Sequence, residues 1–319
     1  MLKDKVYQMF ICGTGKNLNY ALENNLGGVI FFAHDIPSKE EFIKLIKDIK
    51  SKSKTPLFLS IDQEGGRVER TENIHPRCLS PKYAFEKGEI FLREQTKSII
   101  TELEEYGLNM NYAPCLDVNS NPNNPIIGER AFSDNPEDVK KGYDIVSDVY
   151  SESKIIPVIK HFPGHGDADK DSHKELPEID LSLVDMEKTH IQPFKHAIEK
   201  GADFVMVAHL YTKCFGEKKI PTSLNKNCID YLRNTLNFKG ITISDDMYMK
   251  GVSEYGAEGF VMGIKAGINM FICRDTSDET TGIIEYITDK VQKDEYLKAK
   301  IEDSYNKIIS MKEKYKILN

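Results

Sequence analysis

The sequence predicts a (β/α)8 barrel, because short apolar runs alternate with amphipathic helical stretches along the whole chain. Most of these runs are continuously apolar, as a parallel sheet covered on both faces requires. No linker or change of composition divides the 319 residues, so we expect one domain spanning residues 1–319. A doubly wound sheet is the competing fold, but no glycine-rich phosphate-binding turn follows an early strand.

The expected elements follow one another as strand and helix. The strands are predicted at Val6–Cys12, Gly28–Phe32, Leu57–Ile61, Met110–Leu116, Ile155–Ile159, Phe204–Ala208, Ile241–Ile243 and Asn269–Cys273. The helices are predicted at Lys39–Lys50, Phe91–Tyr106, Pro136–Tyr150, Asp185–Lys200, Cys228–Leu236 and Tyr255–Ala266, followed by a charged outer helix at Lys290–Lys316.

The composition narrows the possible partners. A hydrophobic share of 40%, with 29% charged residues, is typical of a globular protein with a large core. The net charge of -7 argues against nucleic acid, which requires a basic surface. The first apolar run is too short for a membrane span or signal peptide, so we expect no membrane partner and a cytoplasmic location. The sequence gives no expectation for the oligomeric state.

The cysteines form no CxxC pair and are scattered along the chain. In a chain of this length we expect them to be reduced, small buried residues rather than disulfides or zinc ligands. They are Cys12, Cys78, Cys115, Cys214, Cys228 and Cys273.

Polar groups follow five of the expected strands at the same end. Active sites of (β/α)8 barrels are built from the carboxyl ends of the strands, so these groups are expected to converge. They are Asp62 after the third strand, Asp117 after the fourth, Lys160 and His161 after the fifth, His209 after the sixth and Asp245 after the seventh.

The segment Lys160–His173 holds three histidines, three aspartates and two lysines, and its glycines and proline predict a loop. Asp171 and His173 are two residues apart, so in extended backbone the carboxylate can orient the imidazole. A solvated Asp–His pair is the simpler alternative. A metal site is another, but the candidate ligands share no familiar spacing, and we expect no metal. Those ligands would be His161, His165, Asp167, Asp169 and His173.

Asp245 lies where a strand would deliver a carboxylate into the site, as a nucleophile or a stabiliser of a cation. Its neighbour Asp246 is better explained as a helix cap or a partner for a backbone amide. Other charged residues are of the types that bind sugar hydroxyls, although each alone could form an ordinary salt bridge. These are Asp62, Arg70, Arg130, Lys160 and His161.

Three motifs occur in order: Asp62–Val68, Lys160–Gly166 with Asp171–His173, and Ser244–Asp246. With them the chain resembles the glycoside hydrolase family 3 β-N-acetylglucosaminidases, and more closely the single-domain cytoplasmic β-hexosaminidases of cell-wall recycling. The similarity spans residues 5 to 275, and the Lys-His-Phe-Pro-Gly-His-Gly…Asp-Ser-His element is its most specific part.

The resemblance implies a retaining exo-β-N-acetylglucosaminidase that needs no cofactor and acts on small peptidoglycan-derived saccharides or muropeptides. It implies Asp245 as the nucleophile and His173, oriented by Asp171, as the general acid/base. The sugar would be bound by Asp62, Arg70, Arg130, Lys160 and His161.

Alternatives remain open. An imidazole acid/base repels an anionic acceptor less than a carboxylate does, so phosphate could replace water and make the enzyme a phosphorylase. A broader β-glycosidase, a non-catalytic sugar-binding barrel and a metal-dependent hydrolase are the others. We also expect residues 164 to 173 to be a mobile arm, because nothing strongly apolar anchors them.

Overall fold

The main sheet of the protein closes into a barrel in chain order. The computed structural model describes residues 1–169 and 175–318. Within these ranges the main sheet has nine strands in the order β5-β4-β3-β2-β1-β11-β10-β8-β6, and every pair is parallel. Only Val158 separates β5 from β6, so these two edges belong to one chain segment and the sheet closes. The expected barrel is confirmed.

The strands are short and almost entirely buried. Those of the barrel are β1 (Phe10–Cys12), β2 (Gly28–Phe31), β3 (Phe58–Ile61), β4 (Met110–Asn111), β5 (Ile156–Pro157), β6 (Ile159–Phe162), β8 (Phe204–Val207), β10 (Ile241–Asp246) and β11 (Met270–Cys273). A separate two-stranded sheet pairs β7 (Glu178–Ile179) with β9 (Tyr211–Thr212).

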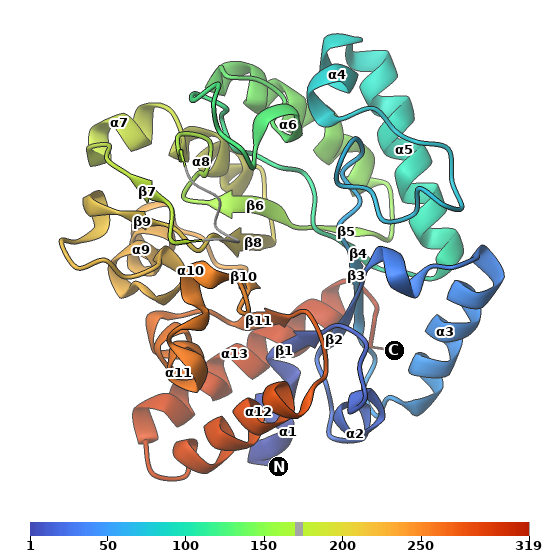
Figure 1. Ribbon diagram of the computed structural model, residues 1–319, viewed down its shortest axis with the longest axis vertical. Helices are drawn as coiled ribbons and strands as arrows, with labels where there is room; N and C mark the ends of the chain where they lie inside the picture. The colour runs from blue at the N-terminus through green and yellow to red at the C-terminus, as the bar shows by residue number, and fades with distance from the viewer. Residues whose placement is uncertain (170–174, 319) are drawn as a thin grey trace.

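Helices surround the strands on all sides (Figure 1). They are α1 (Leu2–Gln8), α2 (Leu18–Glu23), α3 (Lys39–Lys52), α4 (Pro81–Glu86), α5 (Glu89–Tyr106), α6 (Pro136–Ser151), α7 (Leu183–Lys188), α8 (Ile191–Glu199), α9 (Lys226–Asp230), α10 (Lys250–Ser253), α11 (Gly256–Ala266), α12 (Asp278–Val291) and α13 (Glu295–Lys314). Short 3₁₀ turns lie at Ala33–Asp35, Gly128–Arg130, Lys213–Phe215 and Thr222–Leu224, and a π turn at Tyr231–Thr235.

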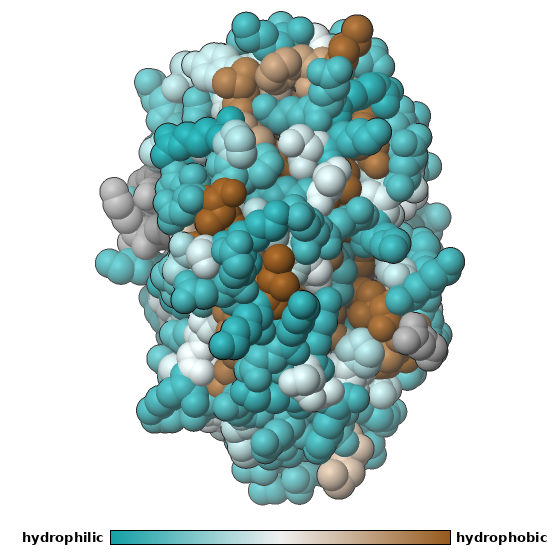
Figure 2. Space-filling model, turned by 90° about the vertical axis from the view of Figure 1, so that its right-hand side faces the viewer, coloured by the Kyte–Doolittle hydropathy of each residue, from teal (hydrophilic) through white to brown (hydrophobic). Residues whose placement is uncertain are grey.

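Local chemistry explains the ends of the longer helices. The side chains of Ser38 and Asn135 accept hydrogen bonds from the first-turn amides of α3 and α6, which satisfies donors that have no partner inside a helix. At the other end of α5 and α11, Gly107 and Gly267 adopt the left-handed conformation that closes a helix. The face shown in Figure 2 is largely hydrophilic, with scattered apolar side chains.

Four expected strands differ clearly from the structure. The strand expected at Ile241–Ile243 continues to Asp246, so Asp245 lies on the strand itself. The residues Val6–Gln8 of the first run belong to helix α1, and only Phe10–Cys12 form a strand. The run Met110–Leu116 yields only the two-residue β4, although the rest of the run still pairs with residues 158–160: the Val158 amide donates to the Ala113 carbonyl at 3.1 Å, and the Leu116 amide donates to the Lys160 carbonyl at 2.6 Å. The run Ile155–Ile159 is two pieces, and β6 continues to Phe162, so Lys160 and His161 lie on a strand rather than in a loop.

The carboxyl-terminal stretch covers the outside of the barrel as expected, but Lys290–Lys316 is not one helix, since α12 ends at Val291 and α13 begins at Glu295. Lys312 of α13 reaches the amino-terminal end of the barrel. Its ammonium donates to Gln8 Oε1 at 2.9 Å, to the carbonyl of Gly27 at 3.0 Å and to that of Pro56 at 2.7 Å. This lysine closes the end of the barrel opposite the polar strand ends.

Two further expectations concern cysteines and membranes. All six cysteines, which lie in the described residues, are free; four are buried, and Cys78 and Cys214 are partly exposed. The free thiols agree with the expected reduced state, whereas the expected burial holds for four cysteines and is wrong for Cys78 and Cys214. In the described ranges no helix combines the length and the apolar character needed to cross a bilayer.

Candidate active site

A polar cavity of about 150 Å³ opens at the carboxyl end of the barrel strands. Its walls come from β6, from the end of β10 and from the segments that follow β3 and β4. This convergence is what the strand-end residues predicted. The lining residues are Asp62, Val68, Arg70, Ile126, Arg130, Lys160, His161, His165, Met206, Asp245 and Met249.

The centre of the site is an ion network around Glu64. The Lys160 ammonium lies 2.5 Å from Glu64 Oε1 and 2.8 Å from Asp62 Oδ1. The guanidinium of Arg130 binds both Glu64 oxygens, at 2.9 and 2.8 Å. Burial would raise the pKa of Glu64, but the charges of Arg130 and Lys160 outweigh it and hold that pKa well below its usual range.

Both cations of this network stay charged. Burial favours the neutral form of Lys160, yet Asp62 and Glu64 more than offset it and raise the pKa of the lysine. Glu64 likewise raises the pKa of Arg130 against the effect of burial. The cavity therefore presents fixed charges that are held by the protein itself, as preorganised binding of a polar ligand requires.

Glu64 was not among the residues proposed from the sequence. The signal was present, because Glu64 follows Asp62 by two residues and such residues point to the same side of extended backbone. Asp117 was noted at a strand end but was not assigned a role.

Asp117 positions the second part of the site. Its Oδ2 lies 2.6 Å from His161 Nδ1, and its Oδ1 accepts the backbone amide of His165 at 2.6 Å. On the other side of the ring, Arg130 Nη2 lies 3.2 Å from His161 Nε2. A guanidinium only donates, so Nε2 accepts and the His161 proton is on Nδ1, directed to Asp117.

Asp245 stands at the end of β10 and faces the cavity. Burial alone would raise its pKa, but neighbouring His161 and His209, the amide of Asp246 and Lys160 outweigh it, so the pKa is lowered. The carboxylate is therefore ionised at neutral pH. Its Oδ1 accepts the amide of Asp246 at 2.8 Å.

Asp246 is a partner for a backbone amide, as the sequence suggested. Its Oδ1 accepts the amide of Tyr248 at 3.1 Å, and its Oδ2 lies 2.9 Å from Arg274 Nε. Burial raises the pKa of Asp246 to about 6. His209 is buried beside Ser223, whose Oγ lies 2.7 Å from Nδ1, and burial lowers the pKa of His209.

Arg70 enters the cavity with unused hydrogen-bonding capacity. Its Nη2 is 3.6 Å from Asp62 Oδ2, beyond hydrogen-bond distance. Its Nε is buried, and among the described residues it has no hydrogen-bond partner. Arg70 is thus available to a ligand. All five residues expected to bind sugar meet around one cavity.

Asp171 and His173 lie outside the described residues, so their expected roles stay predictions. The preceding residues correct one part of the mobile-arm hypothesis: residues 165 to 168 are anchored. Asn124 Nδ2 donates to the His165 carbonyl at 2.8 Å, and the side chain of Ala168 is buried. A Cβ on Gly166 would lie 1.7 Å from the Val118 carbonyl oxygen, so glycine permits this close approach.

The structure is a parallel β/α barrel in which the Asp245 carboxylate, ionised at neutral pH, faces a polar cavity at the carboxyl ends of the strands, as in barrel enzymes. The family model for the glycosyl hydrolase family 3 N-terminal domain matches residues 1–311. The chain belongs to glycosyl hydrolase family 3, a family of glycoside hydrolases, and the resemblance seen in the motifs is confirmed.

Two sequence relatives carry beta-hexosaminidase names, and a solved structure with the same fold is a beta-N-acetylglucosaminidase. Beta-hexosaminidase A of Pseudoalteromonas piscicida is 33% identical over 257 residues, which are 72% of this chain and 42% of that protein. Beta-hexosaminidase of Nitrosomonas eutropha is 32% identical over 264 residues, 78% of this chain and 74% of that one. A glycoside hydrolase family 3 beta-N-acetylglucosaminidase from Paenibacillus sp. str. FPU-7 superposes with a TM-score of 0.93 at 28% identity, covering 99% of this chain and 63% of that chain.

Proposed function

We propose that the protein is a retaining exo-β-N-acetylglucosaminidase that removes terminal β-linked N-acetylglucosamine from small cell-wall saccharides. Asp245 is the nucleophile, and His173, oriented by Asp171, is the general acid/base. The observation that carries the proposal is the lowered pKa of Asp245 in a cavity that Lys160 and Arg70 also line. The names of the relatives support the sugar, and the three motifs support the cell-wall source.

The reaction has two balanced steps. In the first, an Asp245 oxygen bonds to the anomeric carbon while the glycosidic bond breaks, and His173 gives its proton to the leaving oxygen. In the second, His173 takes a proton from water, the water oxygen bonds to the anomeric carbon, and the bond to Asp245 breaks. Two inversions restore the β configuration.

The remaining cavity residues bind the sugar and do not react. Asp62 accepts hydrogen bonds from hydroxyls, and Arg70 and Lys160 donate to hydroxyl or acetamido oxygens. Arg130 and His161 are held by Glu64 and Asp117 at the back of the cavity. Their fixed positions favour one orientation of the ring, which supports catalysis by positioning.

Turnover of p-nitrophenyl N-acetyl-β-glucosaminide tests the assignment of Asp245. We expect Asp245→Asn to lower kcat by many powers of ten, because the covalent path is lost. The matched control is Asp246→Asn, an adjacent carboxylate that accepts a backbone amide and should lower kcat far less. Equal activity in Asp245→Asn and the unmodified protein would remove Asp245 as nucleophile.

Phosphorolysis is the second candidate, and Arg70 supports it. This partly exposed guanidinium has unused donors in the cavity, and phosphate is an anion that arginine binds well. The product assay is run with and without inorganic phosphate. N-acetylglucosamine 1-phosphate as the main product identifies a phosphorylase, whereas the free sugar in both samples identifies a hydrolase.

Two other candidates have separate tests. Binding of N-acetylglucosamine without turnover of any aryl glycoside would indicate a sugar-binding barrel, and turnover of aryl glucosides would indicate a broader β-glycosidase. We propose a cytoplasmic location, which the free cysteines support, since a reducing compartment keeps thiols unpaired.

A further inference from the structure

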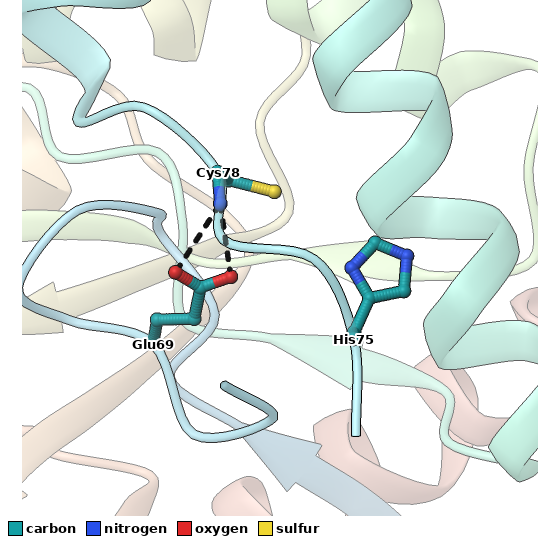
Figure 3. Close-up of side chains that lie close together, drawn as sticks. All are labelled: Glu69, His75 and Cys78. Atoms are coloured by element: carbon teal, nitrogen blue, oxygen red, sulfur yellow. Dashed lines mark hydrogen bonds between the residues drawn. The ribbon is translucent and has the colours of Figure 1, made fainter. Parts of the chain in front are cut away.

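A cluster of three metal-ligand side chains lies on the segment that follows β3, beside the wall of the cavity. Glu69, His75 and Cys78 each bring one ligand atom, and these atoms lie within 4.8 Å of one another. Figure 3 shows the carboxylate, the thiol and the imidazole gathered by the turn of this segment. None of the three was assigned a role from the sequence, although the spacing of His75 and Cys78 is short enough for a shared ion.

The cluster is buried on one side and rich in negative charge. Glu69 is 6% exposed, and Glu102 of α5 is 3% exposed. Glu102 Oε2 lies 3.3 Å from His75 Nδ1. Within the described ranges neither Glu102 oxygen accepts a hydrogen bond of ordinary geometry. Glu102 has His75 and the hydroxyls of Thr71 and Tyr106 beside it, so the cluster brings two buried carboxylates close to one imidazole.

Existing hydrogen bonds leave room for a cation. The amide of Cys78 donates to both oxygens of Glu69, at 3.2 and 3.3 Å, and a carboxylate has about four acceptor positions. Burial and the nearby Glu69 and Glu102 charges raise the pKa of the Cys78 thiol to about 12. A bound dication reverses that effect, because it favours thiolate and carboxylate together.

We propose that Glu69, His75 and Cys78 bind one divalent metal ion of the zinc class, with the Glu102 carboxylate, 3.3 Å from His75 Nδ1, orienting the imidazole. Sulfur and imidazole ligands select zinc-like ions over magnesium or calcium. Bond lengths of about 2.0–2.3 Å place tetrahedral ligands about 3.5 Å apart. The three ligand atoms already lie within 4.8 Å of one another, so binding an ion requires only a small approach of these side chains.

The ion would hold the segment that delivers Arg70 to the cavity. The Gln63 side chain already links the two sites, because its oxygen accepts the Arg70 amide at 2.8 Å and its Nε2 lies 3.4 Å from Glu69 Oε1. The metal is structural in this arrangement and takes no part in the reaction. The ion site does not depend on the proposed enzymatic function, since its ligands lie outside the lining of the cavity.

Titration of the full chain with Co²⁺, after dialysis against a chelator, tests the site directly. We expect about one equivalent to bind with a near-ultraviolet thiolate-to-cobalt band, and Zn²⁺ to displace it. Cys78→Ser should abolish the band, and His75→Gln should weaken binding at least tenfold. The control is Cys214→Ser, another partly exposed cysteine that lies outside the cluster, and it should retain the band.

Three results would overturn the proposal. One is the absence of a band in the unmodified protein, which would leave His75 as a simple partner of Glu102. Another is a band that persists in Cys78→Ser. The third is loss of the band in Cys115→Ser alone, which would place the ion at the other cluster, Cys115, Asp117 and His161. Circular dichroism checks that each variant is folded. If Cys78→Ser does not fold, the weaker binding expected for His75→Gln still tests the proposal.

Discussion

Glu64 pairs with two buried cations, Lys160 and Arg130. Its substitution tests how much this ion network contributes to the free energy of unfolding. Glu64→Gln keeps the size of the side chain and removes its charge. Lys160 is 1% exposed and Arg130 9% exposed, so neither cation can recover its interaction with water. Breaking a buried pair from one side costs about 3–5 kcal/mol.

The lower end of this range applies here. Lys160 keeps Asp62 at 2.8 Å, and the glutamine oxygen still accepts one hydrogen bond. We therefore expect a loss of about 3 kcal/mol in the free energy of unfolding, which is roughly a hundredfold in the folding equilibrium. With a slope of about 3 kcal/mol per molar urea, the midpoint falls by about 1 M.

Urea unfolding followed by circular dichroism measures this change. The control is Glu72→Gln, whose exposed pair with Arg77 should contribute about 0.5 kcal/mol or less. A loss below about 1 kcal/mol in Glu64→Gln, similar to the control, would refute the idea that Glu64 compensates both buried cations.

Three further perturbations have expected outcomes. Gly166→Ala places a Cβ 1.7 Å from the Val118 carbonyl oxygen, so it should lower the free energy of unfolding by about 2 kcal/mol or more and also lower activity. The control is Gly282→Ala, in open space on α12, which should leave the free energy of unfolding unchanged or raise it by up to about 1 kcal/mol. Lys312→Ala leaves three oxygens without their donor and should cost about 3 kcal/mol in urea unfolding without changing KM; a loss near zero would contradict its role in closing the barrel. The pKa of Asp246 is raised to about 6, so this carboxyl stabilises the fold below pH 3.8 and that contribution is lost as pH rises through about 6. Asp246→Asn should therefore reduce the difference in stability between pH 4 and pH 7, and an unchanged difference would contradict the assignment.

The barrel could be predicted because its strands are apolar runs that end in polar groups. The errors have physical causes. Val6–Gln8 is a buried piece of helix α1, and a short buried run has no periodicity that separates helix from strand. β4 ends at Asn111, but hydrogen bonds to residues 158–160 continue past Pro114, so the apolar run marks a paired edge correctly and its irregular ladder could not be seen in the sequence.

The residues of the candidate site could be predicted from the sequence, but their hydrogen-bond and ion-pair partners could not. Asp62, Lys160 and Asp245 stand at strand ends, and strand ends meet in any barrel. The ion-pair partners could not be predicted because they are far apart in the sequence: Glu64 and Arg130 are separated by 66 positions. The cluster of Glu69, His75 and Cys78 could not be predicted for the same reason, since nothing in the sequence places the helix that carries Glu102 beside His75.

The central claim is that Asp245 forms a covalent bond to the sugar. Intact-protein mass spectrometry after incubation with a slow 5-fluoro derivative of N-acetylglucosaminyl fluoride tests it most directly. We predict a mass increase of one glycosyl unit, mapped by peptide sequencing to Asp245 and absent in Asp245→Asn. An adduct on Asp246 or another residue, or continued turnover of the p-nitrophenyl substrate by Asp245→Asn at the unmodified rate, would contradict it.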